Sequence, residues 1–206
     1  MRHDVLAKAL DDPRSTPARL LDAAEEVFAE QGFGAASTRE IARRARVPFG
    51  TLHYHWGSKK ELGEAVMVRL AGWIRDTVVR NFAPGNTPGA ISDGMVDAFL
   101  DALVANRHAV RLLYRAVLEP LPGRVQRMFD ELQELGVGML RQVGLEAQLD
   151  SQAAILFMST GFLATIADEQ GQVIAFGASV FTSRAARERL RAELRRIGRL
   201  VYRVGP

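Results

Sequence analysis

Residues 37–60 hold the side chains whose types and spacing could carry chemistry in this 206-residue chain. Short or flat side chains with few charges gather in one part of it, at Phe49, Gly50, Thr51, His53 and Tyr54. Basic side chains surround that part without interrupting it, at Arg39, Arg43, Arg44, Arg46, Lys59 and Lys60. Cations at the edges can anchor phosphates while flat and short groups at the centre reach base edges. The pattern therefore favours a surface that binds double-stranded DNA.

The distribution of charge agrees with this interpretation. The net charge is +3, yet residues 37–60 carry six basic groups against one acidic group, and residues 183–206 carry eight against two. The rest of the chain is net acidic. A confined positive patch is the electrostatic footprint of a polyanionic partner. Two solvated helix faces would give the same composition, so charge alone leaves both interpretations open.

Patterns that would indicate an enzyme or a metal site are missing from the sequence. There is no Cys, which excludes disulfides, thiolate zinc sites and a cysteine nucleophile. There is also no Gly-x-Ser-x-Gly, no Gly-rich phosphate loop ending in Lys-Ser/Thr, and no His-Glu-x-x-His. His53 and His55 are two residues apart, so on a helix they point in different directions and cannot share a metal ion. We therefore expect no catalytic residue, no metal and no cofactor.

The elements that would position the candidate surface form a helix-turn-helix over residues 37–56. Ser37 and Glu40 have the spacing of a capping box, which predicts a short helix through Ala45. A turn follows at residues 46–47, and Pro48 begins a second helix that runs through Trp56. Small and apolar residues would hold the two helices at a fixed angle, namely Ile41, Ala42, Ala45, Val47 and Leu52. A hairpin packed for purely structural reasons is the alternative.

The remainder of the chain also has helical periodicity. Ser15 and Pro17 begin a helix with apolar residues on one side, and Gly32-Phe33-Gly34 ends it. Ser58 can cap a long helix from residue 59 to about residue 82. Further periodic segments lie at 89–105, 107–118, 124–144, 150–169 and 183–203. We interpret residues 172–181 as a packed loop or an extra helical turn, and residues 1–14 as an arm or an extra turn. The prediction is an all-α protein of about nine helices.

About fifty N-terminal residues contain a set with fixed order and spacing, namely Ala23-Ala24, Phe28-Ala29-Glu30, Gly32-Phe33, Ser37-Thr38, Ile41-Ala42, Ala45, Val47, Gly50-Thr51-Leu52, Tyr54-His55-Trp56, Ser58-Lys59 and Leu62. With this set, the segment resembles the DNA-binding domain of the TetR family of transcriptional regulators. The resemblance implies a homodimeric helical repressor that releases DNA when a small molecule binds its larger domain. It implies three parts, a 1–14 extension, a 15–60 DNA-binding domain, and a 61–206 helical domain for effector binding and dimerisation.

The resemblance also assigns roles to residues of the motif. Thr38 would contact a phosphate, Arg39 a phosphate or a base edge, and Lys59 a phosphate at the start of the next helix. Free N–H groups at both of these helix starts would face phosphates too. The residues facing bases and the nearby backbone would be Pro48, Phe49, Gly50, Thr51 and Tyr54.

Three residues depart from the family pattern. Arg46 stands where glycine is usual in the turn, and if that position keeps a positive φ the arginine costs about 1 kcal/mol, offset by a phosphate contact. His53 replaces a phosphate-contacting tyrosine but can still donate a hydrogen bond. Phe49 can touch a thymine methyl but forms no bidentate hydrogen bond with a base. His55 and Trp56 are expected to pack the second helix of the motif against the helix that begins at Thr16.

The larger domain offers a dimer interface in its last two long segments. Residues 150–169 present an apolar stripe with small residues, consisting of Ala154, Phe157, Met158, Gly161, Phe162 and Thr165. Residues 183–203 carry a seam spaced by four, three and four residues, formed by Leu190, Leu194, Ile197 and Val201. The family resemblance implies that such helices pair across a two-fold axis as a four-helix bundle. The alternative is that both segments belong to the intramolecular core.

The same domain would contain an effector pocket, and its last segment has a basic face. Candidate pocket residues are Trp73, Phe99, Leu103, Tyr114, Met128, Phe129, Phe157 and Phe162. With few polar groups nearby, such a pocket would accept a small, largely apolar effector. The basic face comprises Arg184, Arg187, Arg191 and Arg195. It could be solvated, paired with acidic side chains of the body, or directed at an anionic membrane.

The expected partners are therefore a pseudo-palindromic DNA operator, a second copy of the chain and a small effector. No apolar segment reaches the length of a membrane span and no secretory signal is seen, so we expect a cytoplasmic protein without membrane contact. The alternative function is a ligand-independent DNA-binding regulator of the same fold that acts through protein partners.

Overall fold

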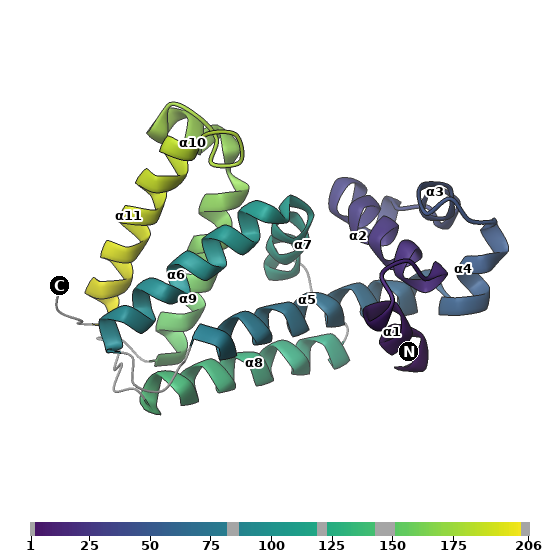
Figure 1. Cartoon of the computed structure of the whole chain (residues 1–206), viewed down its shortest axis with the longest axis horizontal. Coiled ribbons are helices and arrows are strands. Elements are labelled where there is room, and N and C mark those ends of the chain that lie inside the picture. Colours follow the sequence, from purple (N-terminus) through teal and green to yellow (C-terminus); the bar gives the residue numbers. More distant parts are fainter. Residues whose placement is uncertain (1–2, 82–86, 119–122, 143–150, 203–206) are drawn as a thin grey trace. The chain divides into compact units, whose positions relative to one another are not determined.

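The computed structural model describes residues 3–81, 87–118, 123–142 and 151–202, and within them it contains helices and no strands (Figure 1). Those helices are α1 (His3–Asp11), α2 (Thr16–Ala35), α3 (Thr38–Arg44), α4 (Phe49–Trp56), α5 (Lys59–Asn81), α6 (Pro88–Ala105), α7 (Arg107–Leu118), α8 (Gly123–Gln142), α9 (Ser151–Ala167), α10 (Glu169–Phe176) and α11 (Arg184–Val201). The all-α prediction is confirmed. The expected count of about nine is too low, because the described residues form eleven.

The two additional helices are α1 and α10. In α1, Leu6 and Ala9 are buried, and the helix packs against α2. Residues 3–11 are therefore a packed helix. In α10, the Asp168 side chain caps the first turn by accepting from the Gly171 N–H, and Gly177 ends the helix with a left-handed φ of 79°. The Asp168 cap and Gly177 can both be read from the sequence. Because β-branched residues lie between them, the full helix of eight residues was not predicted.

The chain divides into two compact units, and the division falls inside α5. One unit comprises Met1–Leu70 with Leu121–Val125, and the other comprises Ala71–Pro120 with Gln126–Pro206. The first therefore holds α1 to α4 and the beginning of α5. The second holds the end of α5 and nearly all of α6 to α11. The two are described separately below.

The first unit has its core around α2. Its predicted apolar face, which includes Leu20, Leu21 and Phe28, is at most 3% exposed. Helices α1, α3 and α4 all contact α2. An ion pair also ties α5 to α2, because the guanidinium of Arg69 binds the carboxylates of Asp22 and Glu25, and Glu25 is 6% exposed. Ser15 and Ser58 cap α2 and α5 as predicted. The Ser58 hydroxyl accepts from the Glu61 N–H and donates to the Glu61 carboxylate.

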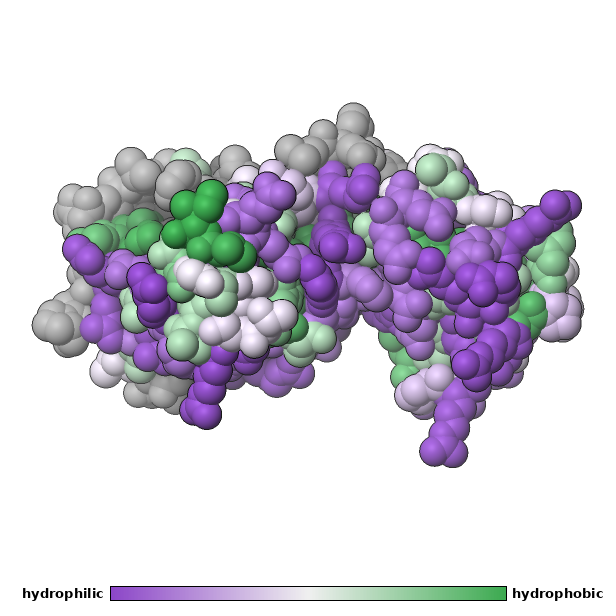
Figure 2. Space-filling model, turned by 90° about the horizontal axis from the view of Figure 1, so that it is seen from above, coloured by the Kyte–Doolittle hydropathy of each residue, from purple (hydrophilic) through white to green (hydrophobic). Residues whose placement is uncertain are grey.

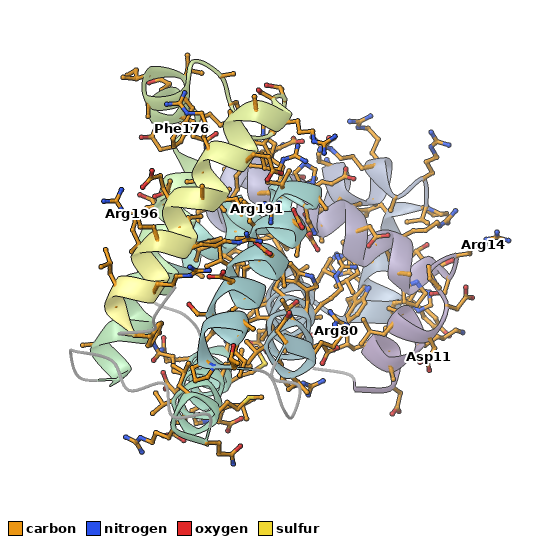
Figure 3. All side chains as sticks on the ribbon, turned by 60° about the vertical axis from the view of Figure 1, so that its left-hand side comes forward. Asp11, Arg14, Arg80, Phe176, Arg191 and Arg196 are labelled. Atoms are coloured by element: carbon orange, nitrogen blue, oxygen red, sulfur yellow. The ribbon has the colours of Figure 1, made fainter. Side chains whose placement is uncertain are left out.

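In the second unit, α6 and α11 lie side by side and are joined by a row of ion pairs (Figure 1). Asp93, Asp97 and Asp101 succeed one another at four-residue intervals along α6. Their partners on α11 have the same spacing: Arg199 binds Asp93, Arg195 binds Asp97, and Arg191 binds Asp97 and Asp101. Figure 3 shows Arg191 between the two helices and Arg196 pointing away from them. For Arg191 and Arg195, the interpretation as salt bridges to the acidic body is the one that the structure supports.

Asp97 is expected to make the second unit sensitive to acid. Partial burial raises the pKa of Asp97, but hydrogen bonds from Arg195 and Arg191 outweigh it and leave the pKa below its ordinary value of 3.8. A carboxyl whose pKa is lower in the folded state stabilises that state above its ordinary pKa, and this contribution disappears as the pH falls through the folded value.

The Asp97→Asn variant should therefore be less stable than the wild type by about 1 kcal/mol at neutral pH. The difference in the free energy of unfolding between the wild type and Asp97→Asn should become smaller as the pH falls below 3.8. Urea unfolding followed by circular dichroism between pH 2 and 7 measures it. Asp76→Asn is the control, because Asp76 pairs only with its exposed neighbour Arg75 among the described partners. Equal pH profiles for both variants would contradict the role given to Asp97.

The segments predicted as a dimer interface are partly used within the chain. Leu190 and Leu194 of α11 are buried at 3% and 6% exposure, so this half of the seam belongs to the intramolecular core. In the other half, Ile197 is 41% exposed and Val201 is half-buried. On α9, Gly161 and Thr165 are exposed and Phe162 is half-buried. The side chains of Ala154, Phe157 and Met158 lie outside the described residues.

The second unit also exposes apolar side chains on α10. Val173 and Ile174 are 50% and 87% exposed. In the view from above, strongly hydrophobic atoms gather at the surface where α10 lies (Figure 2). Among the described residues, no helix is long and apolar enough to cross a membrane.

Candidate nucleic-acid interface

The corner between α3 and α4 closes as a Schellman motif. The Val47 N–H donates to the Ala42 carbonyl at 3.0 Å, and the Arg46 N–H donates to the Arg43 carbonyl at 3.1 Å. Arg46 occupies the left-handed position of this motif with a φ of 55°, and no other non-glycine residue in the described part of the chain has a positive φ. The positive φ expected from the family pattern is therefore present, and the arginine adopts it at a cost of about 1 kcal/mol.

The inner face of α4 anchors this helix to the unit. Leu52 and Trp56 are 0% and 1% exposed, and α4 contacts both α2 and α3. Ile41, Ala42 and Ala45 of the preceding segment are buried as predicted, and Val47 is half-buried. Trp56 is thus the packing residue that the sequence suggested, whereas His55 is only half-buried. The helix is held rigidly from one side.

The outer face of α4 is open. Tyr54 is 74% exposed and Phe49 is 45% exposed, which is unusual for large aromatic side chains. Pro48, Gly50 and His53 are also exposed, and Thr51 is half-buried. A Cβ added to Gly50 would meet nothing within 4 Å, so internal packing does not require glycine there. The predicted base-facing residues therefore lie together along one accessible surface.

An edge-to-face ring contact and one cation order this surface. The Arg39 guanidinium lies over the Phe49 ring at 5.7 Å from its centroid. The His53 and Phe49 rings meet nearly at right angles with centroids 5.4 Å apart, and His53 Nδ1 lies 2.9 Å from the Gly57 carbonyl oxygen. At that distance a protonated Nδ1 donates to the carbonyl, which leaves Nε2 as the ring nitrogen free to meet a partner. Arg39, Phe49 and His53 thus form one row across α3 and α4.

Part of the positive charge predicted at the edges is already neutralised within the protein. Glu40 accepts hydrogen bonds from Arg43 and Arg44, and these bonds lower the pKa of Glu40 to about 2. Arg44 also binds Glu30 of α2 through both terminal nitrogens, and the hydrogen bonds that it donates to Glu30 and Glu40 raise its pKa. Arg44 therefore stabilises the packing of α3 on α2. Glu40 directs its carboxylate to these arginines, while Ser37 caps α3 by accepting from the Arg39 N–H.

The other cations of the motif differ in their availability. Arg46 and Lys60 are exposed and pair with no carboxylate among the described residues. The Lys59 ammonium donates to the backbone carbonyls of Phe33, Gly34 and Ala36, at 2.8, 3.1 and 3.0 Å. These contacts were not anticipated from the sequence. Thr38 is half-buried at the start of α3, close to the Ser37 cap.

The residues proposed for a pocket lie in the second unit. Helix α7 packs on α6 and α9, which brings Phe99, Leu103, Tyr114 and Phe162 onto neighbouring helices. Leu103 is 1% exposed and belongs to the core. The others with described side chains are half-buried, namely Trp73, Phe99, Tyr114, Met128, Phe129 and Phe162. The Phe157 side chain lies outside the described residues. No group of three or more His, Asp or Glu side chains that could hold a metal ion occurs in the described ranges.

Comparison with known proteins places this geometry among bacterial regulators. Residues 20–66 match the family described as bacterial regulatory proteins, tetR family. The HTH-type transcriptional repressor Rv3405c of Mycobacterium tuberculosis is 34% identical over 119 residues, which cover 57% of this chain and 55% of that protein. The HTH-type transcriptional repressor KstR2 of Mycolicibacterium smegmatis is 28% identical over 103 residues, half of each chain. This chain thus spans about half the length of these relatives.

The likeness in structure extends further than the likeness in sequence. A TetR-like transcriptional regulator from Rhodococcus sp. RHA1 superimposes with a TM-score of 0.65 at 27% identity. The superposition covers 89% of this chain and 94% of the other. The similarity therefore includes the second unit as well as the helix-turn-helix.

Proposed function

Because this chain belongs through its N-terminal domain to the tetR family of transcriptional regulators, we propose that it is a sequence-specific DNA-binding repressor. It acts as a homodimer that releases its operator when a small, largely apolar effector binds the second unit. The observation that carries the proposal is the two-sided character of α4. One side, with Leu52 and Trp56, is fully buried, and the other exposes Phe49 and Tyr54. Arg46 before α4 and Lys60 after it are exposed and pair with no carboxylate in the described part of the chain.

The residues have distinct tasks in the proposed complex. Helix α4 enters the major groove, which is about 12 Å wide and accepts an α-helix. Phe49, Thr51 and Tyr54 face the bases, while Pro48 and Gly50 allow close approach of the backbone. As an imidazolium, which carries a proton on each ring nitrogen, His53 can donate to a phosphate through Nε2 while Nδ1 keeps its bond to the Gly57 carbonyl. Thr38, Arg39 and the first N–H groups of α3 and α5 meet phosphates, and Lys59 contributes through its backbone position at the start of α5.

The exposed parts of α9 and α11 support dimerisation. Helix α9 runs from Ser151 to Ala167 without a charged residue, and its apolar residues are not confined to one side. A helix of this kind is normally buried all round, yet Gly161 and Thr165 are exposed in the single chain. On α11, Ile197 and Leu200 are 41% and 63% exposed. Pairing of these surfaces across a two-fold axis would bury them and present two copies of α4 to one duplex.

The proposal is tested by titrating labelled fragments of the DNA upstream of its own coding region with the purified chain at several salt concentrations. A saturable complex is expected whose affinity falls steeply between about 50 and 200 mM salt, as phosphate contacts require. Sedimentation velocity should show two chains per complex. A complex that forms equally well on any fragment and at any salt concentration would contradict sequence-specific binding.

Arg46 provides a prediction in which stability and binding change in opposite directions. Replacement of Arg46 by Gly relieves the left-handed strain and should raise the free energy of unfolding by about 0.5–1 kcal/mol. It also removes an unpaired cation next to α4, so DNA affinity should fall and the slope of log K against log salt should decrease by about 0.9. Chemical unfolding and the DNA titration measure the two effects.

Arg46→Lys is the matched control, because it keeps both the charge and a side chain at the strained position. It should retain the wild-type salt slope and stability. If Arg46→Gly bound DNA with the wild-type salt slope, the Arg46 guanidinium would make no phosphate contact. DNA binding would then not explain why an arginine occupies a left-handed backbone position.

A further inference from the structure

We propose that the Lys59 side chain is a positioning residue that fastens both ends of the helix-turn-helix to each other, and that its ammonium does not contact a phosphate. This inference rests on the proposed DNA-binding function. It explains what keeps α3 and α4 in a fixed orientation.

The first argument is the hydrogen-bonding capacity of the ammonium. A lysine has three N–H donors and no acceptor. All three are matched by carbonyl oxygens within the first unit, those of Phe33, Gly34 and Ala36, at 2.8–3.1 Å. A phosphate could reach the ammonium only if one or more of these bonds broke.

The second argument is the local charge at the end of α2. Gly32, with a φ of 78°, interrupts the helical conformation of α2, and a last turn follows from Phe33 to Ala35. Helix carbonyls near a C-terminus lack intrahelical partners and carry partial negative charge. The Lys59 ammonium satisfies this end, and it also lies 4.8 Å from the centroid of the Phe33 ring in a cation–π contact.

The third argument is the packing of the Phe33 ring, which makes the cation–π contact with the Lys59 ammonium. Phe33 lies 5.3 Å from the Phe28 ring, measured between centroids. A Cβ at Gly63 of α5 would lie 2.7 Å from Phe33 Cε2, so the glycine makes room for the ring. The Phe33 ring therefore contacts Phe28 and Lys59 and lies close to Gly63, although 43% of the residue is exposed.

The Lys59 contacts connect the chain directly before the helix-turn-helix with the chain directly after it. The chain enters the motif at Ser37, directly after Ala36, and leaves it at Gly57, directly before the cap of α5. The Lys59 ammonium bridges these two points. With Arg44 bound to Glu30, it fixes α3 and α4 relative to α2 and α5, and thereby the direction in which α4 presents Phe49 and Tyr54.

The test uses Lys59→Met, which keeps most of the apolar stem, with Lys60→Met as the matched control because Lys60 is exposed and unpaired among the described residues. Hydrogen exchange without DNA should be about tenfold faster at the amides of residues 36–41 in Lys59→Met, since bonds to a charged donor are lost. It should be unchanged in Lys60→Met. Unchanged exchange in Lys59→Met would overturn the proposal.

The second readout is the DNA titration at a temperature where circular dichroism shows both variants fully folded. Lys59→Met should lose affinity about five- to tenfold with the wild-type slope of log K against log salt. A slope lower by about 0.9 would show that the ammonium contacts a phosphate and would overturn the proposal. Wild-type affinity in Lys59→Met would also overturn the proposal. It would show that the side chain stabilises the fold without directing α4 toward DNA. Failure of the wild type itself to bind DNA would instead contradict the proposed function, and the exchange experiment would still decide the role of Lys59 within the fold.

Discussion

Replacement of Trp56 by Ala is expected to destabilise the first unit by about 3–5 kcal/mol, the usual cost of removing a large aromatic from a core. Trp56 is 1% exposed and is the largest of the fully buried side chains. For a unit of this size the midpoint of thermal unfolding should fall by about 15 °C or more. Because α4 is held only by its inner face, DNA binding should be lost together with the fold. Calorimetry and the DNA titration measure the two losses.

Two further variants separate packing from recognition on the same helix. The indole Nε1 of Trp56 finds no hydrogen-bond acceptor among the described residues. Trp56→Phe removes this unsatisfied donor, so its cost should be much smaller, about 1 kcal/mol. Tyr54→Ala should leave stability within about 0.5 kcal/mol, because Tyr54 is 74% exposed, yet it should weaken DNA binding. Loss of stability in Tyr54→Ala equal to that in Trp56→Ala would contradict the two-sided description of α4.

Replacement of Gly50 should have opposite effects on folding and on DNA binding. Because a Cβ there meets nothing within 4 Å, Gly50→Ala should stabilise the helix by about 0.5–1 kcal/mol. Folding alone would thus favour alanine, so internal packing does not explain the glycine, and the proposed approach of DNA would. Where glycine allows a partner to approach the backbone closely, an added side chain clashes with that partner. Gly50→Leu is therefore expected to reduce DNA affinity at least about a hundredfold.

The control for this prediction is Gly138→Ala. Gly138 lies on α8 in the second unit, it is exposed, and a Cβ there also meets nothing within 4 Å. It should give the same gain in stability with wild-type DNA affinity. Chemical unfolding and anisotropy titration are sufficient for both variants. If Gly50→Leu bound DNA as tightly as the wild type, α4 would not approach the duplex at its N-terminal end.

Local signals in the sequence were sufficient to predict most of the first unit. Caps at Ser15, Ser37 and Ser58 determined where α2, α3 and α5 begin, and the 3.6-residue period identified buried residues such as Leu20 and Ile41. Each of these features depends on residues at most four positions apart. Such short-range physics can be read from the chain before any tertiary contact is known.

Features that depend on distant residues were not predicted. The Lys59 ammonium meets carbonyls 23 to 26 positions earlier in the chain, and nothing in the spacing of lysine and phenylalanine indicates that contact. The pairing of α11 with α6 joins residues about 100 positions apart. Its signal was present as two matched four-residue series, aspartates at 93, 97 and 101 and arginines at 191, 195 and 199. From the sequence, the basic face of Arg184, Arg187, Arg191 and Arg195 was compatible with three environments, and pairing with acidic side chains of the body was one of them.

The most direct test of the central claim is selection of binding sites from a library of random duplexes by the wild type, by Phe49→Ala and by Thr51→Ala. If the outer face of α4 reads base edges, the wild type should enrich a sequence with two-fold symmetry. Each variant should then change the preferred bases at defined positions of the half-site, with discrimination on the order of 1–3 kcal/mol per base pair. Enrichment of the same sequence by all three proteins, or of no sequence by the wild type, would contradict the claim.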